Sequence, residues 1–173
     1  VLRRILMQNR TIAVVGLSAT WHRPSYFAAK YMLGHGYTVI PVNPAYEEVL
    51  GQRCYASLRE VPQAVDIVDC FRRAEEIPVI ADEAIAIGAK VLWLQLGVIS
   101  PEAVRKAETA GLEVVMDRCV KIEHARLFGG HGLDRIHRRV PGRELDGVGH
   151  VPGGEHLGHI RAQVCVHEDA LPA

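Results

Sequence analysis

The chain has 173 residues, of which 49% are hydrophobic and 23% are charged, values that are ordinary for a soluble globular protein. This length is enough for one hydrophobic core, with little left over for a second domain. The 20 basic and 20 acidic side chains balance, so no net charge indicates a nucleic acid or a membrane surface as a partner, and we expect neither.

The first ten residues contain only one short apolar run, Ile5–Met7. A secretory signal peptide has roughly 7–15 apolar residues at that place, and a membrane-spanning helix needs about 20. The four cysteines show no Cys-x-x-Cys spacing, which favours reduced thiols over a disulfide framework; they are Cys54, Cys70, Cys119 and Cys165. We therefore expect a cytoplasmic protein.

A strand, a turn of small residues and a helix are predicted in succession near the N-terminus. The strand is expected over Ile12–Val15 and the helix over Pro24–Leu33, because proline is favoured at the first helical position. A turn that leads from a strand into a helix N-terminus is an anion site, since free N–H groups and the helix dipole both attract negative charge. The segment therefore predicts a phosphate-binding corner.

Four side chains or backbone positions at this corner are candidates for the phosphate site: Gly16, Ser18, Arg23 and Ser25. The glycine allows a tight turn, and hydroxyl and guanidinium groups bind phosphate through charge-assisted hydrogen bonds. The alternative interpretation is that the serines only cap the helix and that Arg23 is a solvated charge. The dinucleotide fingerprint Gly-x-Gly-x-x-Gly is incomplete here, because Ser18 stands where the second glycine belongs.

The remaining chain to about residue 130 alternates strand and helix patterns. Further strands are predicted at Tyr37–Val42, Val65–Phe71, Lys90–Leu96 and Leu112–Met116. Further helices are predicted at Pro78–Ile87, Pro101–Ala110 and Lys121–Phe128, and Gly51–Pro62 is expected to contain a short strand at Cys54–Ser57 and a helical turn. This alternation predicts an α/β fold with a doubly wound, mainly parallel five-stranded sheet, which binds ligands beyond the carboxyl ends of its strands.

Two other predicted strand ends carry residues suited to a nucleotide. Asn43 stands where a Rossmann dinucleotide site has an acid for the ribose, and a neutral amide would tolerate a nearby phosphate; a plain extended connection is the alternative. Phe71 and Arg72 follow a buried strand and are suited to stacking on a base or meeting a pyrophosphate. A surface salt bridge is the alternative for the arginine.

Taken together, these motifs resemble those of the small stand-alone CoA-binding proteins of bacteria and archaea, which are similar to the CoA-binding domain of succinyl-CoA synthetase α-subunits. The resemblance runs from about residue 5 to 130, and its motifs are Thr11–Ser18, Arg23–Tyr26, Gly36–Tyr37, Val39–Pro44, Gly51, Asp66–Arg72, Leu92–Gly97 and Val115–Cys119. It implies a Rossmann-like domain over residues 1–130.

The resemblance also implies a ligand and a role. Coenzyme A or an acyl-CoA would bind, with phosphates held by the four residues of the corner. Pro41, Val42 and Asn43 would line the nucleotide, Phe71 and Arg72 would lie beside it, and Gln95 and Gly97 would face the pantetheine arm. The module would be non-catalytic, a carrier, sensor or accessory to a separate acyl-CoA-metabolising enzyme.

Two alternatives remain open on the sequence. The first is an NAD(P)-dependent oxidoreductase, which the fold favours but which Ser18 and the missing acid after Val42 disfavour. The second is a thiol-redox protein that uses Cys119, whose neighbouring arginine and predicted helix start would favour the thiolate.

The last part of the chain, residues 131–173, has a different composition, with six of the nine histidines, seven glycines and three prolines. We expect an irregular C-terminal extension there. A metal site is a weaker possibility, because the spacings of His150, Glu155, His156, His159, Cys165 and His167 fit no zinc pattern. A reading-frame change near Gly130 is a further hypothesis, which one uninterrupted frame in related strains would contradict.

Overall fold

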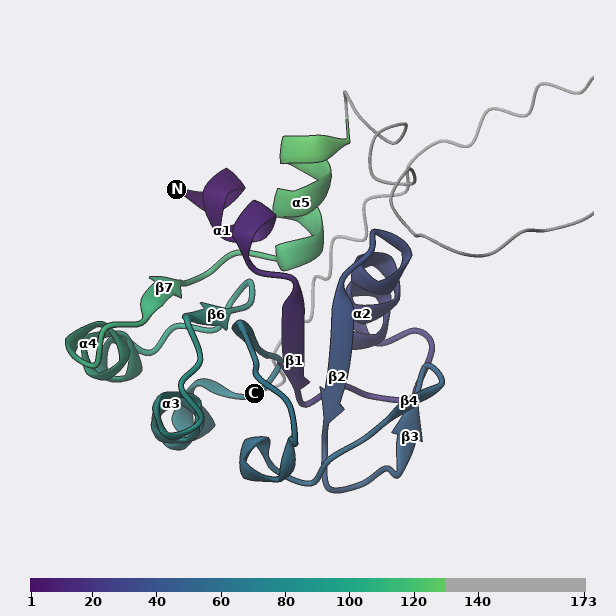
Figure 1. The fold of residues 1–173 in the computed structure, drawn as a ribbon, viewed down its shortest axis with the longest axis horizontal. Helices are drawn as coiled ribbons and strands as arrows, with labels where there is room; N and C mark the ends of the chain where they lie inside the picture. The colour runs from purple at the N-terminus through teal and green to yellow at the C-terminus, as the bar shows by residue number, and fades with distance from the viewer. Residues whose placement is uncertain (130–173) are drawn as a thin grey trace, which may run out of the picture. The chain divides into compact units, whose positions relative to one another are not determined.

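The computed structural model describes residues 1–129, which contain a five-stranded parallel sheet (Figure 1). The strand order is β2-β1-β5-β6-β7, and every neighbouring pair is parallel. The strands are β1 (Thr11–Val15), β2 (Thr38–Val42), β5 (Ile67–Cys70), β6 (Val91–Leu94) and β7 (Glu113–Val115). The predicted Rossmann-like α/β fold is confirmed, and each of the five strands predicted for the sheet is present within one or two residues of its expected ends.

The carboxyl ends of the central strands stand level with one another. Val15 at the end of β1 pairs with Val42 on one side and Cys70 on the other, and Cys70 pairs with Leu94. From β1 the chain first adds β2 on one side and later adds β5, β6 and β7 on the other. This reversal beside β1 is the place where open α/β sheets bind ligands.

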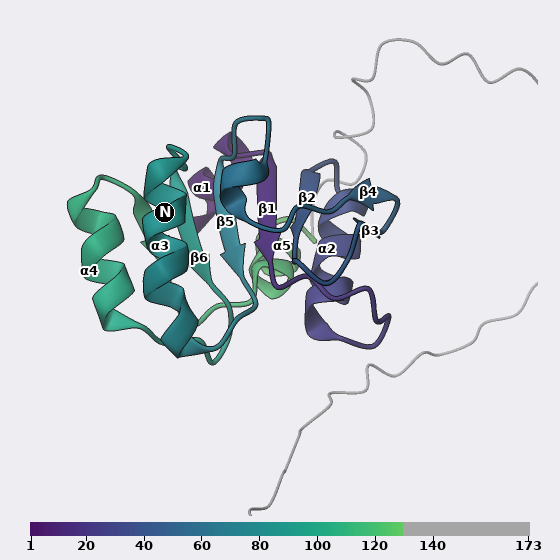
Figure 2. The same ribbon diagram turned by 90° about the horizontal axis from the view of Figure 1, so that it is seen from below.

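Helices cover both faces of the sheet, as a doubly wound fold requires (Figures 1 and 2). One face carries α1 (Leu2–Gln8), α2 (Pro24–Gly34) and α5 (Val120–Phe128), and α5 contacts both of the others. The other face carries α3 (Ile77–Ala86) and α4 (Pro101–Thr109), which lie side by side, and the single-turn helix η1 (Leu58–Glu60); a similar turn, η2 (Ala74–Glu76), precedes α3. The burial of strand residues on both faces explains their near-continuous apolar sequences.

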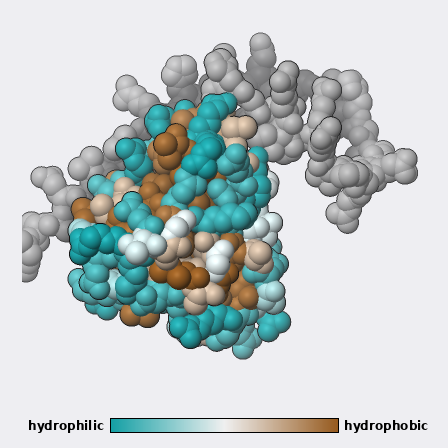
Figure 3. Space-filling view, turned by 60° about the vertical axis from the view of Figure 1, so that its left-hand side comes forward, coloured by the Kyte–Doolittle hydropathy of each residue, from teal (hydrophilic) through white to brown (hydrophobic). Residues whose placement is uncertain are grey.

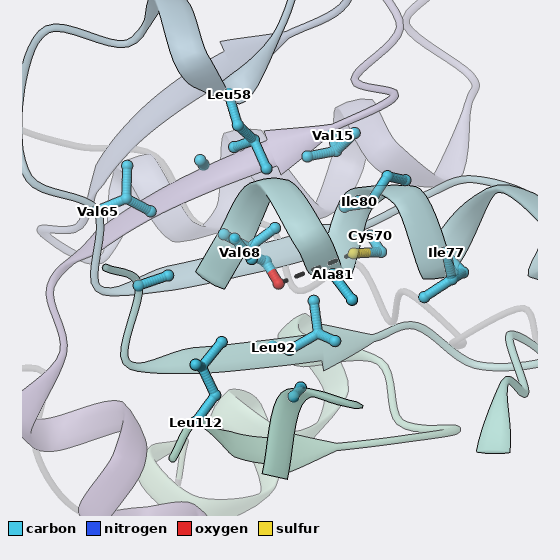
Figure 4. Close-up of a cluster of buried hydrophobic side chains, with 14 of the residues drawn as sticks. Val15, Leu58, Val65, Val68, Cys70, Ile77, Ile80, Ala81, Leu92 and Leu112 are labelled. Carbon is cyan, nitrogen blue, oxygen red and sulfur yellow. Dashed lines mark hydrogen bonds between the residues drawn. The ribbon is translucent and has the colours of Figure 1, made fainter. Parts of the chain in front are cut away.

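Figure 4 shows the hydrophobic core on the α3 face. Val68 and Leu92 project from β5 and β6 against Ala81 of α3, and Leu58 of η1 closes the same cluster. The thiol of Cys70 lies in this core, and burial raises its pKa well above the ordinary thiol value. Cys70 and Cys54 are therefore buried free thiols, while Cys119 is partly exposed.

The segment between β2 and β5 differs in detail from the prediction. It forms a two-stranded antiparallel hairpin of β3 (Glu48–Val49) and β4 (Gln52–Arg53). The strand expected at Cys54–Ser57 is reduced to a single bridge between Tyr55 and Val42, and the expected helical turn is η1. Strands of two residues are too short to give an alternating pattern that sequence reasoning can detect.

Helix α1 was not predicted. Its Ile5 and Leu6 are fully buried, and the Tyr37 hydroxyl donates a 2.6 Å hydrogen bond to the Leu6 carbonyl oxygen. The helix has no side-chain cap, so it carries no start signal in the sequence.

Figure 3 shows hydrophobic residues gathered among hydrophilic ones on one face of the molecule.

Within residues 1–129 no helix combines the length and apolar character that crossing a bilayer requires. The predicted extension over residues 131–173, with its weakly expected metal ligands and the proposed frame change, lies outside the described residues.

Candidate functional site

A cleft of about 600 Å³ opens beyond the carboxyl ends of the central strands. Residues that follow β1, β2, β5 and β6 line it, so the cleft lies at the reversal in strand order. Seven residues predicted from the sequence meet there: Gly16, Ser18, Arg23, Ser25, Asn43, Phe71 and Gln95.

The turn after β1 depends on Gly16. Its φ is +86°, and a Cβ atom added there would lie 2.5 Å from the carbonyl oxygen of Phe71. Its N–H donates a 2.8 Å hydrogen bond to the carbonyl oxygen of Val42. Gly16 therefore shapes the turn and lets the residue after β5, Phe71, approach it closely, and its own N–H is engaged within the protein.

The predicted polar residues of the turn hold one another in place. The N–H of Ser18 donates to Oγ of Ser25 at 3.1 Å, and Oγ of Ser18 accepts the N–H of Thr20 at the same distance. Nδ2 of Asn43 donates to the carbonyl oxygen of Leu17 at 3.0 Å. Each serine hydroxyl still has its own proton to donate, because both act here as acceptors. The amide of Asn43 supports the turn.

The N-terminus of α2 is open to the cleft. Its N-cap residue, Arg23, makes no side-chain capping hydrogen bond, and Arg23, Pro24 and Ser25 all line the cleft. Among residues 1–129 the exposed Arg23 guanidinium forms no ion pair. The Tyr26 and Phe27 N–H groups donate to the Arg23 carbonyl oxygen, and the Ser25 N–H donates to no partner within residues 1–129. This N–H and the unpaired arginine, at the N-terminus of an eleven-residue helix, are suited to bind an anion.

Four predicted site residues do not line the cleft. Pro41 and Val42 are buried within β2, since the cleft lies beyond the strand end and not along the strand. The Arg72 side chain lies against Gly16 with a guanidinium nitrogen 3.9 Å from Glu76. The N–H of Gly97 donates a 2.8 Å hydrogen bond to Oδ1 of Asp117, which ties together the loops after β6 and β7.

Part of the cleft lining is apolar, which the sequence reasoning missed. Leu96, Val98 and Ile122 form this part, and Leu96 and Ile122 are 65% and 56% exposed. One signal could have identified these residues: apolar side chains directly after a buried strand and in the first turn of a helix. Pro24, Tyr46 and Cys119 complete the lining.

A buried carboxyl group lies beside the cleft. Asp69 on β5 is 1% exposed and accepts a 2.7 Å hydrogen bond from Nε2 of Gln95, a cleft residue that is 4% exposed. Burial raises the pKa of Asp69 to about 7, and the hydrogen bond from Gln95 lowers it in part. This pair links β5 to the first residue after β6.

The described lining does not contain a nucleophile paired with a base. No histidine lines the cleft, and the Cys119 side chain makes no hydrogen bond within residues 1–129. A second hollow of about 520 Å³ is lined by three glutamates and one arginine, and this net negative charge disfavours phosphate there; they are Glu47, Glu48, Glu60 and Arg53. The larger cleft is therefore the candidate ligand site.

Comparisons with known proteins address the same part of the chain. The family model described as "CoA binding domain" matches residues 10–125. The uncharacterized protein YneT of Bacillus subtilis is 41% identical over 124 residues, which cover 72% of this chain and 92% of YneT. A hypothetical protein from Pyrococcus horikoshii with a solved structure is 44% identical, with a TM-score of 0.72 over 73% of this chain and 89% of that one.

A larger enzyme contains a similar region. The ADP-forming acetate–CoA ligase I of Archaeoglobus fulgidus is 27% identical over 141 residues. The match covers 76% of this chain but 21% of the ligase. The similarity therefore concerns one region of that enzyme.

Proposed function

Because the chain belongs to the CoA binding domain family, we propose that it binds coenzyme A, free or acylated, in the cleft beyond β1, β5 and β6. The observation that carries this proposal is the uncapped N-terminus of α2, which opens into the cleft with the guanidinium of Arg23 beside it. Coenzyme A carries a pyrophosphate and a 3′-phosphate, and both need such a site.

In this proposal the phosphates bind at the α2 end of the cleft. The hydroxyl protons of Ser18 and Ser25, the guanidinium of Arg23 and the Ser25 N–H, which is the first of α2, are the donors. Charge-assisted hydrogen bonds of this kind are worth about 1.5–3 kcal/mol each. Phe71 lies in the same cleft and offers a ring to the nucleotide.

The pantetheine arm then lies against the apolar residues of the lining. Leu96, Val98 and Ile122 give this part of the lining a hydrophobic surface. Such a surface suits the arm and a short uncharged acyl group better than a charged acyl group. Gln95, which also lines the cleft, is the polar contact for the arm.

We further propose that the protein is a non-catalytic carrier, sensor or accessory module in the cytoplasm. The ADP-forming ligase that resembles it is almost five times as long as the matched region, so its chemistry draws on parts that this match does not include. The cleft's described lining has no nucleophile–base pair, which agrees with binding without a chemical step. A separate enzyme of acyl-CoA metabolism is the partner this role requires.

Calorimetric titration with coenzyme A, dephospho-CoA and NAD tests the proposal. We expect binding of coenzyme A, and a loss of about 10- to 150-fold for dephospho-CoA, which lacks the 3′-phosphate. Binding of NAD with no binding of coenzyme A would contradict the proposal and support the oxidoreductase alternative.

A further inference from the structure

The buried pair of Asp69 and Gln95 connects the interior of the sheet to the cleft. Asp69 lies on β5 and Gln95 directly follows the neighbouring strand β6. Nε2 of Gln95 donates to Oδ1 of Asp69 at 2.7 Å, and both side chains are more than nine-tenths buried. The amide of Gln95 is therefore held by a partner that is itself fixed in the core.

The hydrogen bond to Asp69 determines which polar atom of the Gln95 side-chain amide remains available to another partner. An ionised carboxylate only accepts hydrogen bonds, so it binds the NH₂ group of Gln95. The carbonyl oxygen Oε1 then remains available to accept a hydrogen bond from another group. Oε1 forms no hydrogen bond within residues 1–129. In that part of the chain no fully buried side-chain nitrogen or oxygen lacks a partner. Oε1 therefore has accessible surface, and Gln95 lines the cleft.

We propose that Asp69 is a positioning residue that turns Oε1 of Gln95 toward the cleft, where it accepts a hydrogen bond from an amide N–H of the pantetheine arm. This inference rests on the proposed function, because it identifies which part of coenzyme A the Gln95 side chain recognises. The arm carries two secondary amides. Adenosine 3′,5′-bisphosphate has the nucleotide and 3′-phosphate of coenzyme A without the arm, so it does not use this contact.

The test is calorimetric titration of the full chain at pH 8, where the carboxyl of Asp69 is mostly ionised. The probes are coenzyme A and adenosine 3′,5′-bisphosphate, and the first variant is Asp69→Asn. Asparagine offers both a donor and an acceptor at the same size, so it lets the Gln95 amide turn round. We expect the variant to bind coenzyme A about 2- to 12-fold more weakly, the equivalent of one neutral hydrogen bond, and to bind the bisphosphate as wild type does.

Rescue by an exchanged pair separates positioning from a general structural role. In the double variant Asp69→Asn/Gln95→Glu the carboxylate stands at residue 95, accepts from the asparagine and keeps its second oxygen for the ligand. We expect this variant to recover affinity for coenzyme A relative to Asp69→Asn alone. If thermal melting shows that Asp69→Asn does not fold, Gln95→Leu removes Oε1 directly and should give the same loss for coenzyme A alone.

The outcomes distinguish the inference from the function on which it rests. Equal loss for both probes, or no loss for coenzyme A, would overturn the role of Asp69 while the site itself stands. Failure of wild type to bind either probe would overturn the proposed function as well.

Discussion

The side-chain amide of Asn43, at the end of β2, donates a 3.0 Å hydrogen bond to the carbonyl oxygen of Leu17 in the turn after β1. The same side chain accepts the N–H of Ala45 at 3.0 Å. One amide thus holds both its own loop and the neighbouring turn. The shape of the phosphate corner depends on this contact across two strand ends.

Replacing this amide should therefore loosen the corner. Asn43→Asp keeps the acceptor for Ala45 but places a carboxylate oxygen against the Leu17 carbonyl. We expect the free energy of unfolding to fall by about 1–3 kcal/mol, measured by urea denaturation, and the affinity for coenzyme A to fall as well. Gln52→Glu, the same kind of change at an exposed position of β4, is the control and should have little effect on either quantity.

Arginine substitutions test the phosphate end of the cleft. Arg23→Ala should weaken binding of coenzyme A about tenfold or more, because a charge-assisted contact to phosphate is lost. Arg73→Ala is the matched control, since Arg73 is 84% exposed and lies near Glu76, away from the cleft lining. Equal affinities of the two variants in calorimetry would remove Arg23 from the site.

Alanine substitutions of two glycines test the turn after β1. Gly16→Ala should destabilise the fold by more than the roughly 1–2 kcal/mol of a left-handed alanine, because the new methyl group also meets the Phe71 carbonyl. Gly34→Ala, at the end of α2 with open space around the new atom, should change stability by about 1 kcal/mol or less. Chemical denaturation measures the free energy of unfolding of both variants. Similar losses of stability would contradict the close approach of the Phe71 carbonyl to Gly16.

The buried carboxyl of Asp69 should make stability depend on pH. Its pKa rises from an ordinary 3.8 to about 7 in the folded protein, so folding disfavours the ionised form. Its contribution to the free energy of unfolding therefore decreases as pH rises from about 4 to 7. Asp69→Asn removes this decrease and should be more stable than wild type above pH 7, by up to the order of 4 kcal/mol. A difference that does not change with pH would exclude this origin.

The buried imidazole of His124 should act in the opposite pH direction. Burial first, and then the nearby charges of His35 and Arg10, lower its pKa from 6.5 to about 4. Folding thus disfavours the charged form, and the contribution of this group to stability is lost as pH falls from about 6.5 to 4. His124→Gln should flatten this acid loss, measured as unfolding free energy against pH, whereas His22→Gln at an exposed position is the control.

The fold was largely predictable because its signals are local. Runs such as Ile12–Val15 are apolar on both faces, and Pro24 and Pro101 mark helix starts at their first residues. Helix α1 was missed because seven residues without a cap are stabilised by packing and not by propensity.

The candidate site was predictable in part, for a related reason. Ser18, Arg23 and Ser25 lie on one continuous turn and helix start, so chain order alone brings them together. Leu96 follows β6 and Ile122 lies on α5, and only the folded chain brings them to one cleft, which no local pattern encodes. Pro41 and Val42 were expected to line the nucleotide but do not line this cleft, because both are buried within a strand and only residues after its end reach the cleft.

The two edges of the sheet bear on how the protein behaves at high concentration. Along β2, Pro41 has no N–H, its carbonyl oxygen accepts the N–H of Tyr55, and the carbonyl of Tyr55 accepts the N–H of Asn43. At the other edge β7 has three residues, and Arg4 of α1 pairs with its Glu113. Neither edge offers a long row of free backbone groups on which a strand of another molecule could add. The sheet is thereby protected from edge-to-edge aggregation, although it is open at both sides.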